Sequence, residues 1–110
     1  MQVQGDRRRR EGRVQVGGSV RLLVDSADGL VTTHGQLVDL SEGGFAVHLS
    51  RPMDAHHAGR VNLVVDGKAL WLPMVTRWAR ADSGGWTVGC EFDRPTPDKV
   101  QAIRAMLQGR

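Results

Sequence analysis

Hydrophobic and polar residues alternate over short runs, a spacing typical of strands with one buried face. In Ser19 to Ala27, SVRLLVDSA, the residues Val20, Leu22 and Val24 share one side. Further runs of this kind cover Leu30 to Leu40, Phe45 to Leu49, Arg60 to Val65, Ala69 to Arg80 and Trp86 to Phe92. Glycine-containing turn signals separate these runs. The pattern predicts an all-β fold in which six strands close into a small barrel without open edges.

The periodicity changes near the C-terminus. Thr96 suits the N-cap of a helix, and Pro97 suits the first helical position. Apolar residues then recur at helical spacing, at Val100, Ile103, Met106 and Leu107, and Gly109 provides a stop signal. We therefore expect a helix of about three turns, whose apolar face packs across the barrel or against another chain.

The bulk composition fits one small soluble domain. The chain has 110 residues, of which 40% are hydrophobic and 25% charged. No apolar run approaches the roughly 20 residues that span a bilayer, and no apolar stretch follows the N-terminal arginines as in a signal peptide. Cys90 is the only cysteine, so no internal disulfide forms. We expect a cytoplasmic protein without membrane insertion.

Positive charge is concentrated in one N-terminal segment. Residues 6 to 13 hold five arginines against one aspartate and one glutamate, a net charge of +3. The whole chain is also +3, so the remaining residues sum to zero. The arginines are Arg7, Arg8, Arg9, Arg10 and Arg13. Their concentration predicts an anionic partner.

Catalytic arrangements are absent from the sequence pattern. The histidines, His34, His48, His56 and His57, do not match a metal-ligand spacing. Cys90 lies in an apolar strand and is interpreted as a buried hydrophobe. The tryptophans, Trp71, Trp78 and Trp86, could stack on bases, but their alternating context favours packing in the core or at the barrel rim. We expect no enzyme activity, no metal and no cofactor.

The stretch DLSEGG, residues 39 to 44, has two interpretations. Asp and Ser often cap turns, and Gly supplies positive φ, so a turn explains the composition. Alternatively, Asp39 and Ser41 lie two residues apart at a strand end and face the same side. A carboxylate there could accept hydrogen bonds from guanine, with Gly44 leaving room for the ring.

These two stretches together resemble the PilZ domain family, bacterial receptors for cyclic di-GMP. The family's R-x-x-x-R motif matches Arg9 to Arg13, and its D-x-S-x-x-G motif matches Asp39 to Gly44. The segment VGCEF, Val88 to Phe92, is also similar to the family. The resemblance extends from about Arg7 to the C-terminal helix. It implies a six-stranded antiparallel β-barrel with a C-terminal α-helix.

The resemblance also implies a division of the chain and a set of ligand contacts. Residues 1–18 would be a flexible segment that closes over the ligand, 19–94 the barrel, and 95–110 the helix. Arg9 and Arg13 would bind phosphates and guanine, Asp39 and Ser41 would bond the base, and Gly44 would leave room. Arg8, which precedes the motif, is associated in the family with an intercalated ligand dimer. Two ligands per domain are therefore expected.

Alternative functions stay open at this stage. A small nucleic-acid-binding barrel with a basic arm would also attract phosphate. Its cations usually spread over a strand face, whereas charge outside the arm is balanced here, so no DNA or RNA partner is expected. A PilZ-like adaptor without ligand binding is the other alternative. The downstream protein, in motility, biofilm or exopolysaccharide pathways, is not specified by the sequence.

Overall fold

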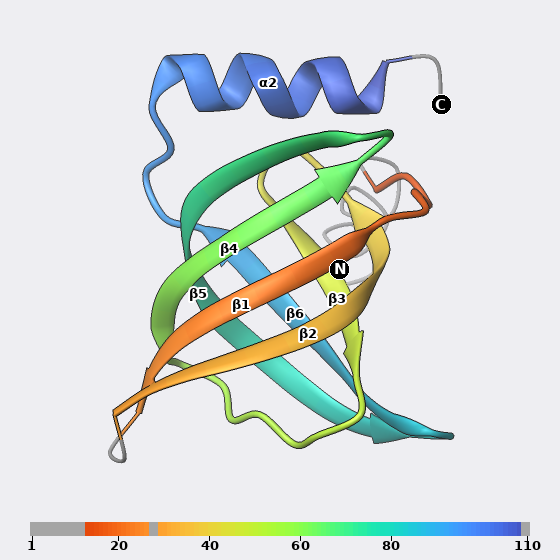
Figure 1. Ribbon diagram of the computed structural model, residues 1–110, viewed down its shortest axis with the longest axis vertical. Helices are drawn as coiled ribbons and strands as arrows, with labels where there is room; N and C mark the ends of the chain where they lie inside the picture. The colour runs from red at the N-terminus through yellow and green to blue at the C-terminus, as the bar shows by residue number, and fades with distance from the viewer. Residues whose placement is uncertain (1–12, 27–28, 109–110) are drawn as a thin grey trace, which may run out of the picture.

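The computed structural model describes residues 13–26 and 29–108. Antiparallel strands form a closed barrel with the order β1-β2-β3-β6-β5-β4, and helix α2 lies across one end (Figure 1). The elements are β1 (Ser19–Ser26), β2 (Gly29–Leu40), β3 (Gly44–Leu49), β4 (Ala58–Val65), β5 (Lys68–Asp82), β6 (Gly85–Phe92) and α2 (Pro97–Leu107). The predicted barrel with a C-terminal helix is confirmed. The division at residues 18 and 94 stays a prediction, and residues 1–12 of its first segment lie outside the described residues.

Inward-facing side chains of the strands fill the barrel. Val20, Leu22 and Val24 are at most 3% exposed, in accordance with their alternation in the sequence. Ile103 and Met106 of α2 join the same hydrophobic core. The amphipathic helix therefore covers one open end of the barrel, where burial of its apolar stripe holds it in place.

The helix begins as its sequence predicts and ends slightly earlier. The Thr96 side chain accepts a hydrogen bond from the Lys99 backbone N–H, and Pro97 occupies the first turn. The helix ends at Leu107, after which Gln108 is extended. The predicted stop, Gly109, lies outside the described residues. Across residues 13–26 and 29–108, no helix is long and apolar enough to cross a membrane.

Two β-bulges alter the alternation of the strands. The register shifts between Leu37 and Asp39 in β2, and between Thr76 and Trp78 in β5. Each bulge adds one residue, so two successive side chains point outward. These are Val38 and Asp39 in β2, and Arg77 and Trp78 in β5. The bulges therefore place polar and aromatic groups together on the outer surface.

The tryptophans lie outside the fully buried core, so of the two expected settings, core or barrel rim, the core is excluded. All three are half-buried. Trp71 lies under the guanidinium of Arg60, at 5.5 Å from the ring centroid, and Trp78 lies under that of Arg80, at 5.3 Å. Both of these rings face outward in the strand register, where an arginine lies over each ring. Trp86 pairs with the buried Leu49 near the start of β6, at the rim of the barrel.

A buried threonine anchors the connection between β3 and β4. Thr76 in β5 is fully buried. Its hydroxyl accepts a hydrogen bond from the His57 backbone N–H at 2.9 Å and donates one to the Asp54 carbonyl at 3.0 Å. This single side chain thus satisfies backbone groups at two points of a loop that closes the barrel end away from α2 (Figure 1).

Replacement of Thr76 by valine should destabilise the protein. Valine has nearly the same shape but leaves the His57 N–H and the Asp54 carbonyl without that partner, a loss of about 1–3 kcal/mol. Urea unfolding followed by tryptophan fluorescence measures the change. Thr32→Val makes the same chemical change at an exposed position of β2 and should stay within about 0.5 kcal/mol of the parent. Equal stabilities of the two variants would show that the Thr76 hydrogen bonds contribute nothing.

Candidate ligand-binding site

A backbone bridge positions the last arginine of the R-x-x-x-R stretch. The Val14 N–H donates to the Leu40 carbonyl at 2.9 Å, and the Leu40 N–H donates back to Val14 at 2.9 Å. Leu40 is fully buried at the end of β2. Arg13 therefore enters the fold directly beside the D-x-S-x-x-G stretch, although the two are far apart in the sequence.

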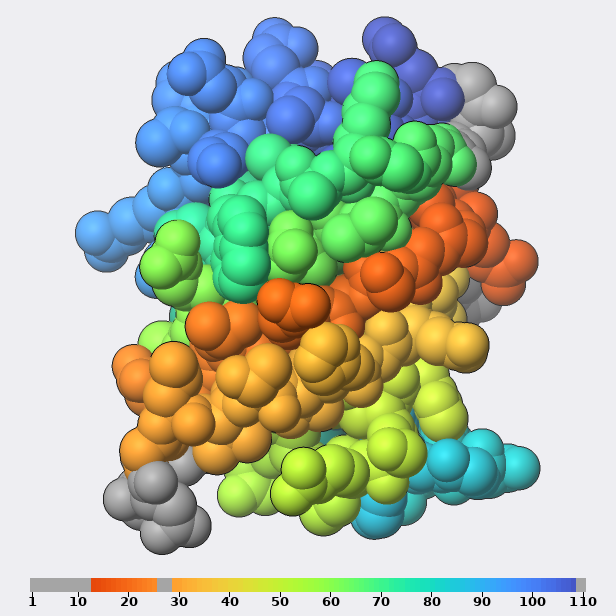
Figure 2. All heavy atoms as spheres, in the orientation of Figure 1, coloured from red at the N-terminus to blue at the C-terminus, as the bar shows by residue number. Residues whose placement is uncertain are grey.

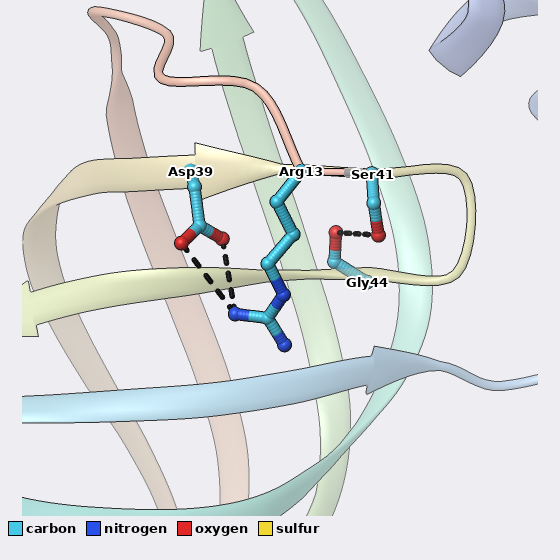
Figure 3. A network of polar contacts seen from close by, with 4 residues as sticks. All are labelled: Arg13, Asp39, Ser41 and Gly44. Carbon is cyan, nitrogen blue, oxygen red and sulfur yellow. Dashed lines mark hydrogen bonds and ion pairs between the residues drawn. The ribbon is translucent and has the colours of Figure 1, made fainter. Parts of the chain in front are cut away.

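Arg13 and Asp39 form an ion pair at this junction. Nη1 of Arg13 lies 3.3 Å from Oδ1 of Asp39 and 3.5 Å from Oδ2 (Figure 3). The side chains are 26% and 19% exposed, so water screens this pair less than a fully exposed one. Figure 3 shows Asp39 and Ser41 on the same side, as the sequence predicts, with Arg13 between them. Ser41 lies one residue beyond the end of β2 rather than in the strand.

The turn between β2 and β3 is closed by Ser41 and Gly44. The Ser41 N–H donates to the Gly44 carbonyl at 2.9 Å, and its hydroxyl bonds to the same oxygen at 3.3 Å. A Cβ on Gly44 would lie 2.1 Å from the Cys90 carbonyl oxygen. Glycine is thus required by the close approach of β3 and β6. Its expected role in leaving room for a ligand ring stays a prediction. Gly43 and Gly44 do not have the positive φ expected of a turn glycine.

Small residues form a floor on the outer face of β3 and β6. The strand register aligns Asp39, Ala46, Gly89 and Trp78 in one row across β2, β3, β6 and β5. A Cβ on Gly89 would lie 2.2 Å from the Trp78 indole, so the ring lies directly against this glycine. The row therefore has a carboxylate at one side, an aromatic ring at the other, and little side-chain bulk between them. Figure 2 views the barrel from the side of β4, β1 and β2, away from this floor.

A cavity of about 190 Å³ opens over this floor. Arg13, Ser41, Gly43 and Gly44 line one part, and Arg77, Trp78, Gly89, Cys90 and Glu91 line the other. Asp39 is not among the lining residues, but its carboxylate contacts Arg13, which is. The cavity thus combines guanidinium groups, hydrogen-bonding groups of a turn, and an aromatic wall.

The structure brings together four of the six residues expected to bind ligand. Arg13, Ser41 and Gly44 line the cavity and Asp39 contacts Arg13 beside it, while Arg8 and Arg9 lie outside the described residues. Sequence reasoning missed the contribution of β5 and β6, which is Arg77, Trp78, Gly89 and Glu91. The segment VGCEF is similar to the family, but its residues reach the site only through pairing with the bulged part of β5. That pairing depends on strand register, which local sequence does not specify.

A second polar cluster lies at the far end of β3 and β6. Nε2 of His48 lies 3.2 Å from Oδ1 of Asp82, and the Thr87 hydroxyl also bonds to Asp82. The bond from Thr87 lowers the pKa of Asp82, and His48 lowers it further. In a catalytic triad the nucleophilic hydroxyl contacts the imidazole base. Here the Thr87 hydroxyl contacts the Asp82 carboxylate instead. The cluster therefore joins three strands and does not resemble a catalytic triad.

Metal binding finds no support among the described side chains. Within residues 13–26 and 29–108, no three His, Cys, Asp or Glu side chains gather as a metal site requires. The two ion pairs at the cavity each contain one carboxylate and one guanidinium. The described part of the site thus offers groups for hydrogen bonding and anion binding.

Comparisons with known proteins point to one family. The sequence model described as PilZ domain matches residues 7–109. The PilZ domain of CeSA from a cellulose-synthesizing bacterium is 25% identical, with a TM-score of 0.67, over 88% of this chain and 95% of that one. A comparison with curated proteins found no match.

Two further solved structures share the fold at lower identity. The PilZ domain of YcgR from Escherichia coli, solved with c-di-GMP, is 14% identical with a TM-score of 0.67, over 84% of this chain and 82% of that one. The Bacillus subtilis inhibitor of motility, MotI/DgrA, is 18% identical with a TM-score of 0.66. That match covers 89% of this chain and 50% of the Bacillus chain. These likenesses concern the barrel fold.

The Cys90 thiol, which is buried in the barrel core, should react slowly in the folded protein. Burial raises its pKa from an ordinary 9.0 to about 12, so at pH 8 roughly a thousandfold less of it is thiolate. Labelling with iodoacetamide, followed by mass spectrometry, should be much slower in buffer than in denaturing urea. Equal rates in the two conditions would show that Cys90 is accessible in the fold.

Proposed function

The chain belongs to the PilZ domain family, and on this premise we propose that it is a receptor module for cyclic di-GMP that regulates a partner protein. The observation that carries the proposal is the Arg13–Asp39 ion pair, held beside Ser41 at the edge of the cavity. These residues match the two motifs on which the resemblance to the family depends. The YcgR domain, which shares the barrel fold, was solved with c-di-GMP.

The chemistry of the pair suits guanine. The base presents O6 and N7 as acceptors, which a guanidinium can bond bidentately. Its N1–H and N2–H₂ groups are donors, which a carboxylate accepts. In the structure, Arg13 and Asp39 satisfy each other at 3.3 Å. We propose that the ligand replaces this mutual contact, so that Asp39 and Ser41 bond the base and Arg13 bonds the base or a phosphate.

Arg8 and Arg9 complete the proposed site from outside the described residues. Arg9 is assigned to phosphate and guanine, together with Arg13, as the family motif implies. Arg8 is assigned to the additional phosphates of a second ligand molecule. Arginine suits these roles better than lysine, since its planar group bonds bidentately and also stacks on bases.

Ligand binding is proposed to act as a switch. An arginine segment that closes over an anion changes the surface beside β2 and β3, and a partner protein can respond to that change. CeSA comes from a cellulose-synthesizing bacterium and MotI/DgrA is described as an inhibitor of motility. A partner in exopolysaccharide synthesis, biofilm formation or motility is therefore proposed, without assignment to one of them.

We also propose a binding module without enzyme activity, cofactor or nucleic-acid partner, located in the cytoplasm. The hydroxyl of the His48–Asp82–Thr87 cluster bonds to the carboxylate and not to the imidazole, which supports binding rather than catalysis. Cys90 is an unpaired, buried thiol, which agrees with a reducing compartment.

Replacement of Arg13 or Asp39 should weaken binding of cyclic di-GMP. A charged hydrogen bond contributes about 1.5–3 kcal/mol, so Arg13→Ala and Asp39→Ala should each raise the Kd roughly tenfold to a hundredfold. Arg9→Ala should do the same, and lysine at either arginine position should restore affinity only in part. Isothermal titration calorimetry measures these changes. Arg21→Ala, on the exposed face of β1, serves as control. Parent-like affinity in the Arg13 and Asp39 variants would refute the site.

Stoichiometry tests the role of Arg8. The parent should bind two molecules of cyclic di-GMP per chain, and Arg8→Ala should bind one, because the second molecule loses a phosphate contact. The same calorimetric titration, carried to saturation, gives both values. Saturation of the parent at one ligand per chain would contradict the assignment.

A further inference from the structure

A second arginine–carboxylate pair faces the first across the floor of the cavity. Nε of Arg77 in β5 lies 2.8 Å from Oε1 of Glu91 in β6, and a second nitrogen of the same guanidinium also contacts that oxygen. Both side chains line the cavity. Neither residue belongs to the two motifs on which the proposed function rests. The proposed function therefore gives this pair no ligand contact.

Each pair includes one residue at or next to a β-bulge. Asp39 follows the bulge in β2, and Arg77 is the extra residue of the bulge in β5. Between them lie Ala46 and Gly89, which pair with each other and carry little side-chain bulk. Each side of this floor therefore presents one guanidinium and one carboxylate.

An adjacent guanidinium and carboxylate match the edge of guanine. Along that edge, N7 and O6 accept hydrogen bonds, and N1–H and N2–H₂ donate them. A guanidinium supplies two donors for the first half, and a carboxylate supplies two acceptors for the second half. Adenine presents a donor at N6 and an acceptor at N1, so the same pair is mismatched to it.

We propose that Arg77 and Glu91 form a second guanine subsite, bounded by the Trp78 ring and facing the Arg13–Asp39 pair. This inference rests on the proposed binding of cyclic di-GMP. The indole is held against Gly89, where a Cβ would lie 2.2 Å from its Cε2 and Nε1 atoms. It forms a fixed wall beside the pair.

The size and exposure of the site agree with this role. The cavity of about 190 Å³ is smaller than the roughly 300–1,000 Å³ of sites that enclose a whole drug-sized ligand. It therefore suits bases rather than a complete dinucleotide. Arg77 and Glu91 are 52% and 54% exposed, and an ion pair of that exposure contributes little to stability. A ligand can thus take over its hydrogen bonds at small cost to the fold.

Calorimetric titration of Arg77→Gln and Glu91→Gln with cyclic di-GMP tests the proposal. If the second guanine belongs to a second ligand molecule, saturation should fall from two ligands to one. If it belongs to the same molecule, stoichiometry should stay constant while the Kd rises roughly tenfold to a hundredfold. Glu91→Gln should also narrow the preference for cyclic di-GMP over cyclic di-AMP, because the amide can donate where the carboxylate only accepts.

Arg104→Gln provides a matched control. It breaks the Arg104–Glu42 pair, which is 51% and 53% exposed and does not line the cavity, so binding should equal that of the parent. The double variant Arg77→Glu with Glu91→Arg keeps an ion pair but exchanges the groups. It should have the melting temperature of the parent but the weakened ligand binding of the single variants. That result would show that the two side chains act by contacting the ligand and not by stabilising the fold.

The outcomes distinguish this inference from the proposed function. Unchanged stoichiometry, Kd and base preference in the Arg77 and Glu91 variants, with normal binding by the parent, would overturn the second subsite alone. Failure of the parent to bind cyclic di-GMP would overturn both. Loss of binding in the Arg13 variant, with no change in the Arg77 variant, would confine base recognition to the first pair.

Discussion

The candidate site depends on the backbone bridge between Val14 and Leu40. Its two hydrogen bonds, each 2.9 Å long, join the segment after the arginine run to the buried end of β2. Together with the buried Val16 and the Arg13–Asp39 pair, the bridge holds Arg13 beside the D-x-S-x-x-G stretch. The bridge is a main-chain interaction that fixes where the arginine side chain starts, and the Val14 side chain packs against the core. Arg13 thereby becomes part of a defined cavity lining.

The barrel adds the remaining constraints through register. Bulges in β2 and β5 turn extra side chains outward on either side of β3 and β6. Between these bulges, Gly44 and Gly89 are small because a Cβ would meet the Cys90 carbonyl or the Trp78 ring. The close packing of two strands thus leaves a shallow cavity with charged pairs at its sides. The same residues that let the strands approach also create the space for a ligand.

Much of the fold could be predicted from local pattern, whereas half of the cavity could not. Alternation located six strands, and Thr96 with Pro97 located the start of α2, because these signals act over a few residues. The motif residues Arg13, Asp39 and Ser41 were found by resemblance. The outward position of Trp78 and the pairing of Arg77 with Glu91 depend on one extra residue in β5. A bulge reverses the facing of later residues in its strand and has no reliable local signal, so simple alternation does not place Trp78 on the outer face.

The central claim is that this barrel selects cyclic di-GMP through its arginine and carboxylate groups rather than attracting phosphate in general. The most direct measurement is calorimetric titration of the full chain with cyclic di-GMP, GTP and a short single-stranded oligonucleotide, each at low and high salt. The account predicts saturable binding of cyclic di-GMP that persists at high salt, and weak binding of the other two. Preferential binding of the oligonucleotide with a steep salt dependence, and no response to cyclic di-GMP, would contradict it.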